Sequence, residues 1–203
     1  MISIITGDIV NSRDFPSKIW TKALKDILST FGKSPNDWEI YRGDEFQIEV
    51  KNIEETLLVA LQIKAFLKSI GIDVRMSIGI GEKSFKTKRI SESNGSAFVN
   101  SKVLFDTLKA QKINLAVNSD NPEFDYEMNL MLKMASNFMN SWLVQSAELV
   151  LIAIQNRQFS QDEIGEKLGI NQAAVSRRKK RAQFDLVKDL DNYFRKKIET
   201  INQ

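Results

Sequence analysis

Two aspartates are the residues of this sequence best suited to chemistry. Asp8 follows a short apolar run, and Asp44 stands between two segments of alternating polarity. If those segments form a hairpin beside the first strand, the two carboxylates converge, and converging carboxylates suit magnesium. The structural alternative is that Asp44 is an ordinary turn residue, because aspartate is common in turns and at strand ends. A third arrangement pairs Asp44 with Arg42 or Arg75.

The composition limits what such a site can bind. The 203 residues include no cysteine, which excludes disulfides and zinc–thiolate sites, and no histidine, which removes the usual general base. A bound metal must therefore have oxygen ligands, and we predict magnesium or manganese. Hydrophobic residues make up 42% of the chain and no apolar stretch is long enough to cross a membrane. We expect a soluble, cytoplasmic protein with no membrane partner.

A second group of suggestive residues lies near the carboxyl-terminal end. Residues 160–203 hold ten Lys or Arg and seven Asp or Glu, which accounts for the whole net charge of +3. Ser160 and Glu163 have the spacing of a capping box, and Gly169 stands where a sharp turn needs a positive φ. Asn171 can cap the next helix. The pattern predicts a helix-turn-helix unit that binds DNA. The alternative is a solvated helical hairpin with an incidental basic run.

The second helix of this unit is predicted to carry the DNA contacts. Its first turns would enter the major groove, and the basic run that follows would contact phosphates. The predicted base-reading residues are Gln172, Ala173, Ser176 and Arg177, and the predicted phosphate contacts are Arg178, Lys179, Lys180 and Arg181. The unit resembles the helix-turn-helix of bacterial transcriptional regulators and the promoter-reading domain of sigma factors.

The elements that must position the two aspartates follow from apolar spacing. Strands are predicted at residues 2–5, 38–42, 46–50 and 73–81, with a helix after Pro16 and another at 53–70. This βαββαβ order predicts a ferredoxin-like α+β sandwich, with helices on one face of an antiparallel sheet. A polar loop at 82–94, a helix at 96–110 and a strand at 113–117 follow.

The rest of the chain is predicted to be helical. The best linker candidate is residues 118–122, and helices follow at 124–144, 147–157, 161–168 and 171–201. We therefore predict an α+β domain at residues 1–120, a connecting helix at 121–145 and an all-α helix-turn-helix DNA-binding domain at 146–203.

A homodimer is expected for two reasons. One helix-turn-helix covers little DNA, and two-fold dimers are the common solution. The last predicted helix also carries a larger apolar face than a short neighbour would cover. That face consists of Phe184, Leu186, Val187, Leu190, Phe194 and Ile198.

Four motifs over about 100 residues resemble nucleotide cyclases. Residues 6–12, Thr-Gly-Asp-Ile-Val-Asn-Ser, are similar to the first-strand motif of class III nucleotide cyclases. Residues 41–46, Tyr-Arg-Gly-Asp-Glu-Phe, are similar to the Gly-Gly-Asp-Glu-Phe hairpin of diguanylate cyclases. Residues 75–81 and 95–100 are similar to later stretches in the same order. With the helix-turn-helix, the whole chain resembles the SatD family, which begins with a Thr-Gly-Asp-Ile-Val-x-Ser-Arg stretch.

The resemblance implies roles for individual residues. Asp8 and Asp44 match the cyclase metal ligands, and Asn100 matches a catalytic asparagine that supports the transition state. The phosphate-cradling loop corresponds to Ile9, Val10, Asn11, Ser12 and Arg13. Leu104 stands where cyclases have a transition-state arginine, and Arg42 replaces the first hairpin glycine of diguanylate cyclases. Loss of such an arginine costs several kcal/mol of barrier, so binding is more easily retained than turnover.

These observations predict a DNA-binding regulator whose cyclase-like domain binds a nucleotide with a divalent metal. The alternative is an active nucleotide cyclase or nucleotidyl-transfer enzyme that carries a DNA-binding module. In that case Arg13, Lys86, Lys88 or Arg89 would replace the missing arginine. A third interpretation treats Asp8 and Asp44 as vestigial, in a domain that only dimerises.

Overall fold

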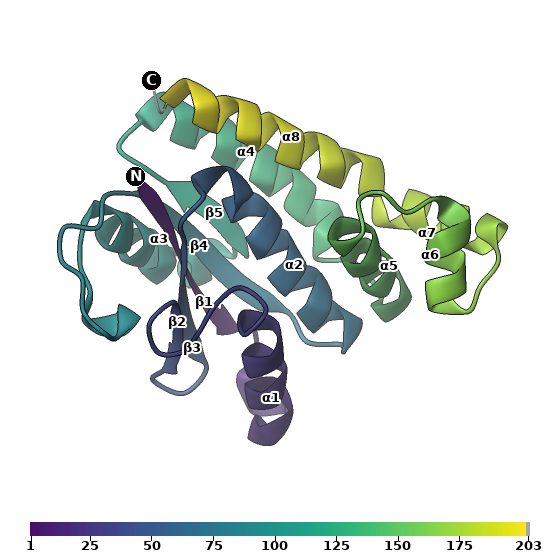
Figure 1. Ribbon diagram of the computed structural model, residues 1–203, viewed down its shortest axis with the longest axis horizontal. Coiled ribbons are helices and arrows are strands. Elements are labelled where there is room, and N and C mark those ends of the chain that lie inside the picture. Colours follow the sequence, from purple (N-terminus) through teal and green to yellow (C-terminus); the bar gives the residue numbers. More distant parts are fainter. Residues whose placement is uncertain (202–203) are drawn as a thin grey trace.

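A computed structural model describes residues 1–201, which form a mixed α+β fold with one five-stranded sheet and eight α-helices (Figure 1). The strands are β1 (Ile2–Ile9), β2 (Trp38–Tyr41), β3 (Glu45–Val50), β4 (Val74–Gly81) and β5 (Leu115–Asn118). The helices are α1 (Ser17–Leu28), α2 (Thr56–Ser69), α3 (Ser96–Gln111), α4 (Pro122–Met139), α5 (Val144–Gln155), α6 (Gln161–Leu168), α7 (Gln172–Ala182) and α8 (Phe184–Ile201). Short 3-10 segments lie at Ser12–Asp14, Ile53–Glu55 and Ile90–Glu92.

Strand β1 occupies the middle of the sheet, whose order is β2-β3-β1-β4-β5. It runs antiparallel to both neighbours, and only the β4–β5 pair is parallel. The prediction that this strand stops at residue 5 is wrong, because pairing with β3 continues to Gly7 and pairing with β4 continues to Ile9. Gly7 is suited to this place, since a Cβ there would lie 2.6 Å from the Phe46 ring. The longer strand carries Asp8 to the end of the sheet.

Successive residues of β1 belong to two different cores, as expected for side chains that alternate across a sheet. Ile5 and Ile9 pack in the main core, beneath α1 and α2. Ile4 packs on the other face, against Ala97 and Phe98 of α3. The sheet therefore has α1 and α2 on one face and α3 on the other (Figure 1).

The carboxyl-terminal helices form a further layer over α2. The main core extends without interruption from Ile5 to Ile198, so it crosses both predicted domain boundaries. Helix α8 returns along α4, where the rings of Phe124 and Phe194 lie 6.0 Å apart (Figure 1). The boundaries at residues 120 and 146 stay a prediction. No helix among residues 1–201 combines the length and apolar character needed to cross a bilayer.

The single helix predicted at residues 171–201 is wrong, because the chain breaks at Gln183, whose φ is 54°. The Trp142 Nε1 group donates to the carbonyl of Ala182 at 2.9 Å and holds this junction. In α8, the apolar face predicted for a dimer is buried within the chain, and Leu186 alone among those six residues is exposed. The homodimer therefore stays a prediction that rests on the small footprint of one DNA-binding unit.

A substitution at Phe194 tests whether the whole chain unfolds as one unit. Phe194→Ala should lower the free energy of unfolding by about 3–5 kcal/mol, because the ring is fully buried between α8 and α4. Since the core is continuous, chemical denaturation followed by tryptophan fluorescence and by circular dichroism should give one coincident transition. Leu186→Ala, on the exposed side of α8, is the control and should change the free energy little. Two separate unfolding transitions, of which only one shifts in the Phe194→Ala variant, would contradict a single core.

Candidate functional site

A polar pocket of about 410 Å³ lies where β1 ends. It is lined by both predicted metal ligands, Asp8 and Asp44, and by four of the five predicted nucleotide-binding residues. Those four are Ile9, Asn11, Ser12 and Arg13. Val10 does not line the pocket, and its N–H donates to the Asp73 carbonyl at 2.9 Å. The motif at residues 6–12 and the hairpin that carries Asp44 thus lie next to each other at this pocket.

The loop after β1 presents backbone donors to this pocket. Asn11 has a left-handed conformation, with φ 54° and ψ 42°, and a short 3-10 turn begins at Ser12. Within residues 1–201 the N–H groups of Asn11, Ser12 and Arg13 donate to no backbone carbonyl or side chain. Successive free N–H groups in such a turn form a concave anion-binding surface. The loop can therefore receive a phosphate.

The charges of the pocket are mixed. Asp14, Arg75 and Lys109 complete its lining, so three carboxylates face three cations, with Arg13 the third. The Arg75 Nε lies 3.3 Å from the Asp8 Oδ1, yet neither of these buried atoms makes a hydrogen bond. A buried polar atom without a partner is costly, and a bound ligand can supply the missing bond.

Burial raises the pKa of Asp8 from 3.8 to about 6. The Arg75 guanidinium opposes this rise, whereas the nearby carboxylates of Asp44 and Glu45 add to it. A carboxyl group beside like charges is stabilised when a divalent cation arrives. Since Arg75 acts on the pKa of Asp8 more strongly than Asp44 does, the charge of the two carboxylates is already partly compensated.

Asp8 and Asp44 are the two carboxylates at the pocket that were predicted to hold a divalent metal. Within residues 1–201, no cluster of three or more acidic side chains has the geometry of a complete metal site. Magnesium, however, is usually held by one or two carboxylates together with water and substrate phosphates. Asp8 and Asp44 fit that mode, and they fit a cation that arrives with a phosphorylated ligand better than a cation alone.

The structure does not bring Asn100 to this pocket. Its Nδ2 donates to the carbonyl of Ile80 at 2.8 Å and to Asp120 at 3.2 Å, so the side chain ties α3 to the far end of β4. Leu104 packs in a small apolar cluster with Phe105 and Leu108. The cation that α3 contributes is instead Lys109, near the other end of the helix.

Sequence reasoning named Arg75 only as a possible partner of Asp44, and it missed Lys109 altogether. Arg75 stands directly opposite Asp8 in the β1–β4 register, so pairing the two predicted strands would have found it. Lys109 has no such signal, because its position depends on how α3 crosses the sheet.

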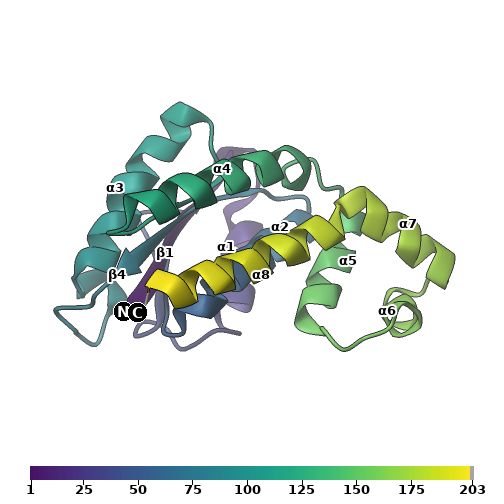
Figure 2. The ribbon, with the colours of Figure 1, turned by 90° about the horizontal axis from the view of Figure 1, so that it is seen from above.

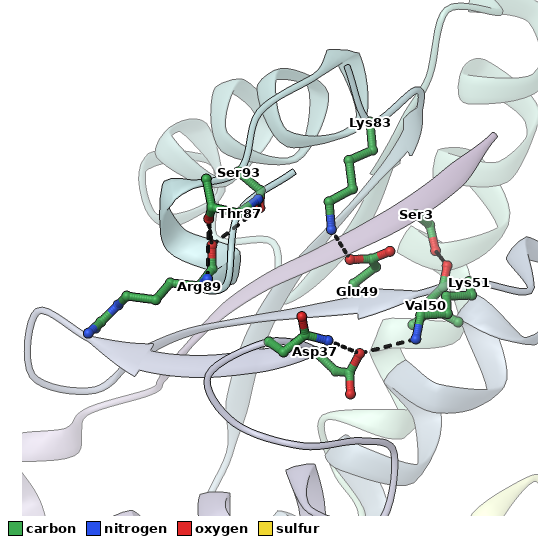
Figure 3. A network of polar contacts seen from close by, with 10 residues as sticks. Ser3, Asp37, Glu49, Val50, Lys51, Lys83, Thr87, Arg89 and Ser93 are labelled. Carbon is green, nitrogen blue, oxygen red and sulfur yellow. Dashed lines mark hydrogen bonds and ion pairs between the residues drawn. The ribbon is translucent and has the colours of Figure 1, made fainter. Parts of the chain in front are cut away.

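The basic loop at residues 82–94 is attached to β2 and β3 and not to the pocket. Lys83 forms an ion pair with Glu49 of β3, and Figure 3 shows this side chain reaching from the loop to the strand. Arg89 forms an ion pair with Glu39 of β2. Lys86 and Lys88 are exposed and do not line the pocket. Of the four cations considered as replacements for the missing arginine, only Arg13 lies at the pocket.

The local structure predicted for α6 and α7 is present. Ser160 and Glu163 form a complete capping box, and Asn171 caps α7 by accepting from the N–H of Ala174 at 2.9 Å. Gly169 turns the chain with a φ of 64°. At Gly165 a Cβ would lie 2.6 Å from the carbonyl oxygen of Ile170, so only glycine allows this close approach. The two helices form one end of the molecule, away from α3 (Figure 2).

Helix α7 exposes one continuous face. A helix turns 100° per residue, so positions 172, 173, 176, 177, 180 and 181 share one half of its surface. Six predicted DNA contacts occupy that half and are exposed: Gln172, Ala173, Ser176, Arg177, Lys180 and Arg181. The other two predicted contacts flank the buried side. Arg178 lies 3.7 Å from Glu148, and the Lys179 Nζ lies 5.3 Å from the centre of the Phe184 ring.

A comparison with protein families gives one finding for this chain. The family model described as SatD family matches residues 1–202. No curated protein matches the sequence.

The raised pKa of Asp8 predicts a pH dependence of stability. The folded state binds this proton more tightly than the unfolded state, so the carboxylate destabilises the fold once it ionises. The difference in unfolding free energy between the wild type and Asp8→Asn should therefore fall as the pH rises from about 4 to about 6, and level off above that. Urea denaturation of both proteins from pH 4 to 8 measures this difference. A flat difference would mean that Asp8 titrates normally.

Proposed function

The chain belongs to the SatD family, and we propose that it is a DNA-binding regulator whose amino-terminal domain binds a nucleotide together with a divalent metal. The single observation that carries the DNA part is the exposed face of α7. Six side chains that suit base edges and phosphates lie on one half of a helix whose other half is held by the chain itself.

The arrangement of α6 and α7 supports a helix-turn-helix assignment. α6 is short and capped, the turn uses Gly169, and Val175 of α7 is buried among the same apolar residues as Ile164. In such units the second helix enters the major groove with its first turns. Gln172, Ala173 and Ser176 would then face base edges, while Lys180 and Arg181 would contact phosphates.

The nucleotide part is supported by the pocket at the end of β1. The first four strands have the antiparallel order β2-β3-β1-β4, with α1 and α2 on one face, which is the order of a ferredoxin-like sandwich. The free N–H groups of residues 11–13, together with Arg13, Arg75 and Lys109, would hold phosphate groups. Asp8 and Asp44 would hold magnesium or manganese, which neutralises phosphate charge when bound.

An active cyclase or nucleotidyl-transfer enzyme is the second candidate, and Lys109 is the observation that favours it. This lysine comes from the same helix as Leu104 and brings a cation to the pocket. The position of Asn100 weighs against it, because the cyclase asparagine would have to act at the pocket rather than at the far end of β4.

The DNA interface predicts a difference between two pairs of neighbouring cations. Replacing exposed cations that contact phosphates reduces the release of counterions, by about 0.9 in the log–log salt slope per contact. Lys180→Gln with Arg181→Gln should therefore make the slope shallower by roughly 1.8. Arg178→Gln with Lys179→Gln removes the same charge from the flanks of the buried side and should leave the slope nearly unchanged. Fluorescence anisotropy with duplex DNA from 50 to 300 mM salt measures both. Equal slopes for the two double variants would remove this face from the interface.

The nucleotide pocket predicts a ligand response that depends on Asp44. A nucleoside triphosphate with magnesium should raise the melting temperature of the wild type, while magnesium alone should do little. Asp44→Asn should abolish the response and leave the ligand-free protein as stable as before or slightly more stable, because one of two neighbouring negative charges is lost.

Asp26→Asn, on the exposed side of α1, is the control for that measurement and should respond like the wild type. If Asp44→Asn destabilises the ligand-free protein, the carboxylate is structural and the metal assignment fails.

A further inference from the structure

A second cavity, of about 240 Å³, lies between the sheet-covering layer and the α6–α7 pair, away from the pocket at Asp8 and with Lys179 as the residue that α7 contributes to its lining. Its apolar walls come from four elements that are distant in sequence, and they include Leu58 and Leu61 of α2, Ile154 of α5, Ile164 of α6 and Val187 of α8. An apolar cavity of about 150 Å³ is enough to hold benzene. This cavity therefore has room for an aromatic ring with a short substituent.

The charged residues that line the cavity are mainly cationic. Arg157, Lys179 and Lys188 line it together with one acid, Asp191, and two amides, Asn156 and Asn192. Asp191 is already compensated, because its Oδ2 accepts from Arg195 at 2.9 Å and from Arg157 at 3.2 Å. Within residues 1–201 neither Lys179 nor Lys188 has an acidic side chain within ion-pair distance. An apolar interior with two lysines that lack acidic partners suits an anion more than a cation.

The Asp191 carboxylate also lacks one hydrogen bond. Asp191 is 5% exposed, and its Oδ1 is buried without any partner. The Asp191 Oδ2 and the neighbouring Arg195 are fixed, since Arg195 binds Glu55 through two bonds of 2.5 and 3.0 Å. The Asp191 carboxylate is therefore held in place while one oxygen stays unsatisfied, and a water molecule rather than the carboxylate of a ligand would supply the missing donor.

We propose that this cavity is a binding site for a small aromatic or aliphatic carboxylate, with its apolar body between α2, α5 and α8 and its carboxylate at Lys179 and Lys188. The site is separate from the pocket at Asp8 and does not depend on the proposed function. A ligand there touches α2 on one side and both α6 and α7 on the other, so it fixes the α6–α7 pair relative to the sheet-covering layer.

Three probes of equal shape and different charge test the proposal on the full chain. They are 3-phenylpropionate, 3-phenylpropanol and 3-phenylpropylamine, with binding measured by isothermal titration calorimetry and by thermal shift. The carboxylate should bind about tenfold more tightly than the alcohol, a ratio that corresponds to about 1.4 kcal/mol. The amine should bind most weakly.

Two neighbouring lysines of α7 provide the matched variants. Lys179→Gln should weaken binding of the carboxylate about tenfold, by the same 1.4 kcal/mol. Lys180→Gln, one residue away on the exposed face, should leave it unchanged. Ala153→Leu fills the cavity and should abolish binding of all three probes without lowering the melting temperature.

Three results would overturn the proposal: no binding of any probe at millimolar concentration, preference for the amine, or an equal effect of the two lysine variants. Since both lysines lie at the surface of a helix, neither variant removes a core side chain, and the outcome does not depend on the cavity-filling variant.

Discussion

Helix α2 is buried on both of its faces, and this constraint decides where the second half of the chain can lie. Ten of its fourteen residues are buried, including Leu57, Leu61 and Lys64. One face is covered by the sheet, and the other requires a further layer, which α5 supplies. Because Lys64 is fully buried, its ammonium must be compensated: it donates to Asp73 and to Asn140, each at 2.9 Å. Those bonds fix the end of α4. They therefore also fix the position at which the chain continues into α5, α6 and α7.

The candidate sites are therefore parts of one packed body. The pocket at Asp8 opens on the side of the sheet that carries α3, whereas α7 lies beyond α2 and α5. Between them there is continuous apolar packing from β1 through α2 to α5. Helix α8 holds α7 from the other side, through the junction at Gln183.

Sequence reasoning succeeded where the determining contacts are local. The capping box at Ser160, the turn at Gly169 and the hairpin around Gly43 each depend on a few neighbouring residues, and all three are present. It failed where distant segments decide the outcome. β1 is longer than predicted because two neighbours bind it, and α8 turns inward because α4 offers it a partner. In the candidate pocket, sequence reasoning predicted those lining residues that belong to a recognisable motif. Asn100 was assigned to it by resemblance alone, and the path of α3 places that residue elsewhere.

The return of α8 has a consequence for how the chain is made. Arg195 of α8 meets Glu55, 140 residues earlier, so the core begun by the first half of the protein waits for α8 to be synthesised. Such long-range closure is slow and leaves apolar surface open on the ribosome, where chaperones act. The same delay sets the order in which the helices pack, because α7 is held in place only when α5 and α8 have both docked. A chain that holds α7 in its final place is thus one whose sheet and pocket at Asp8 are already assembled.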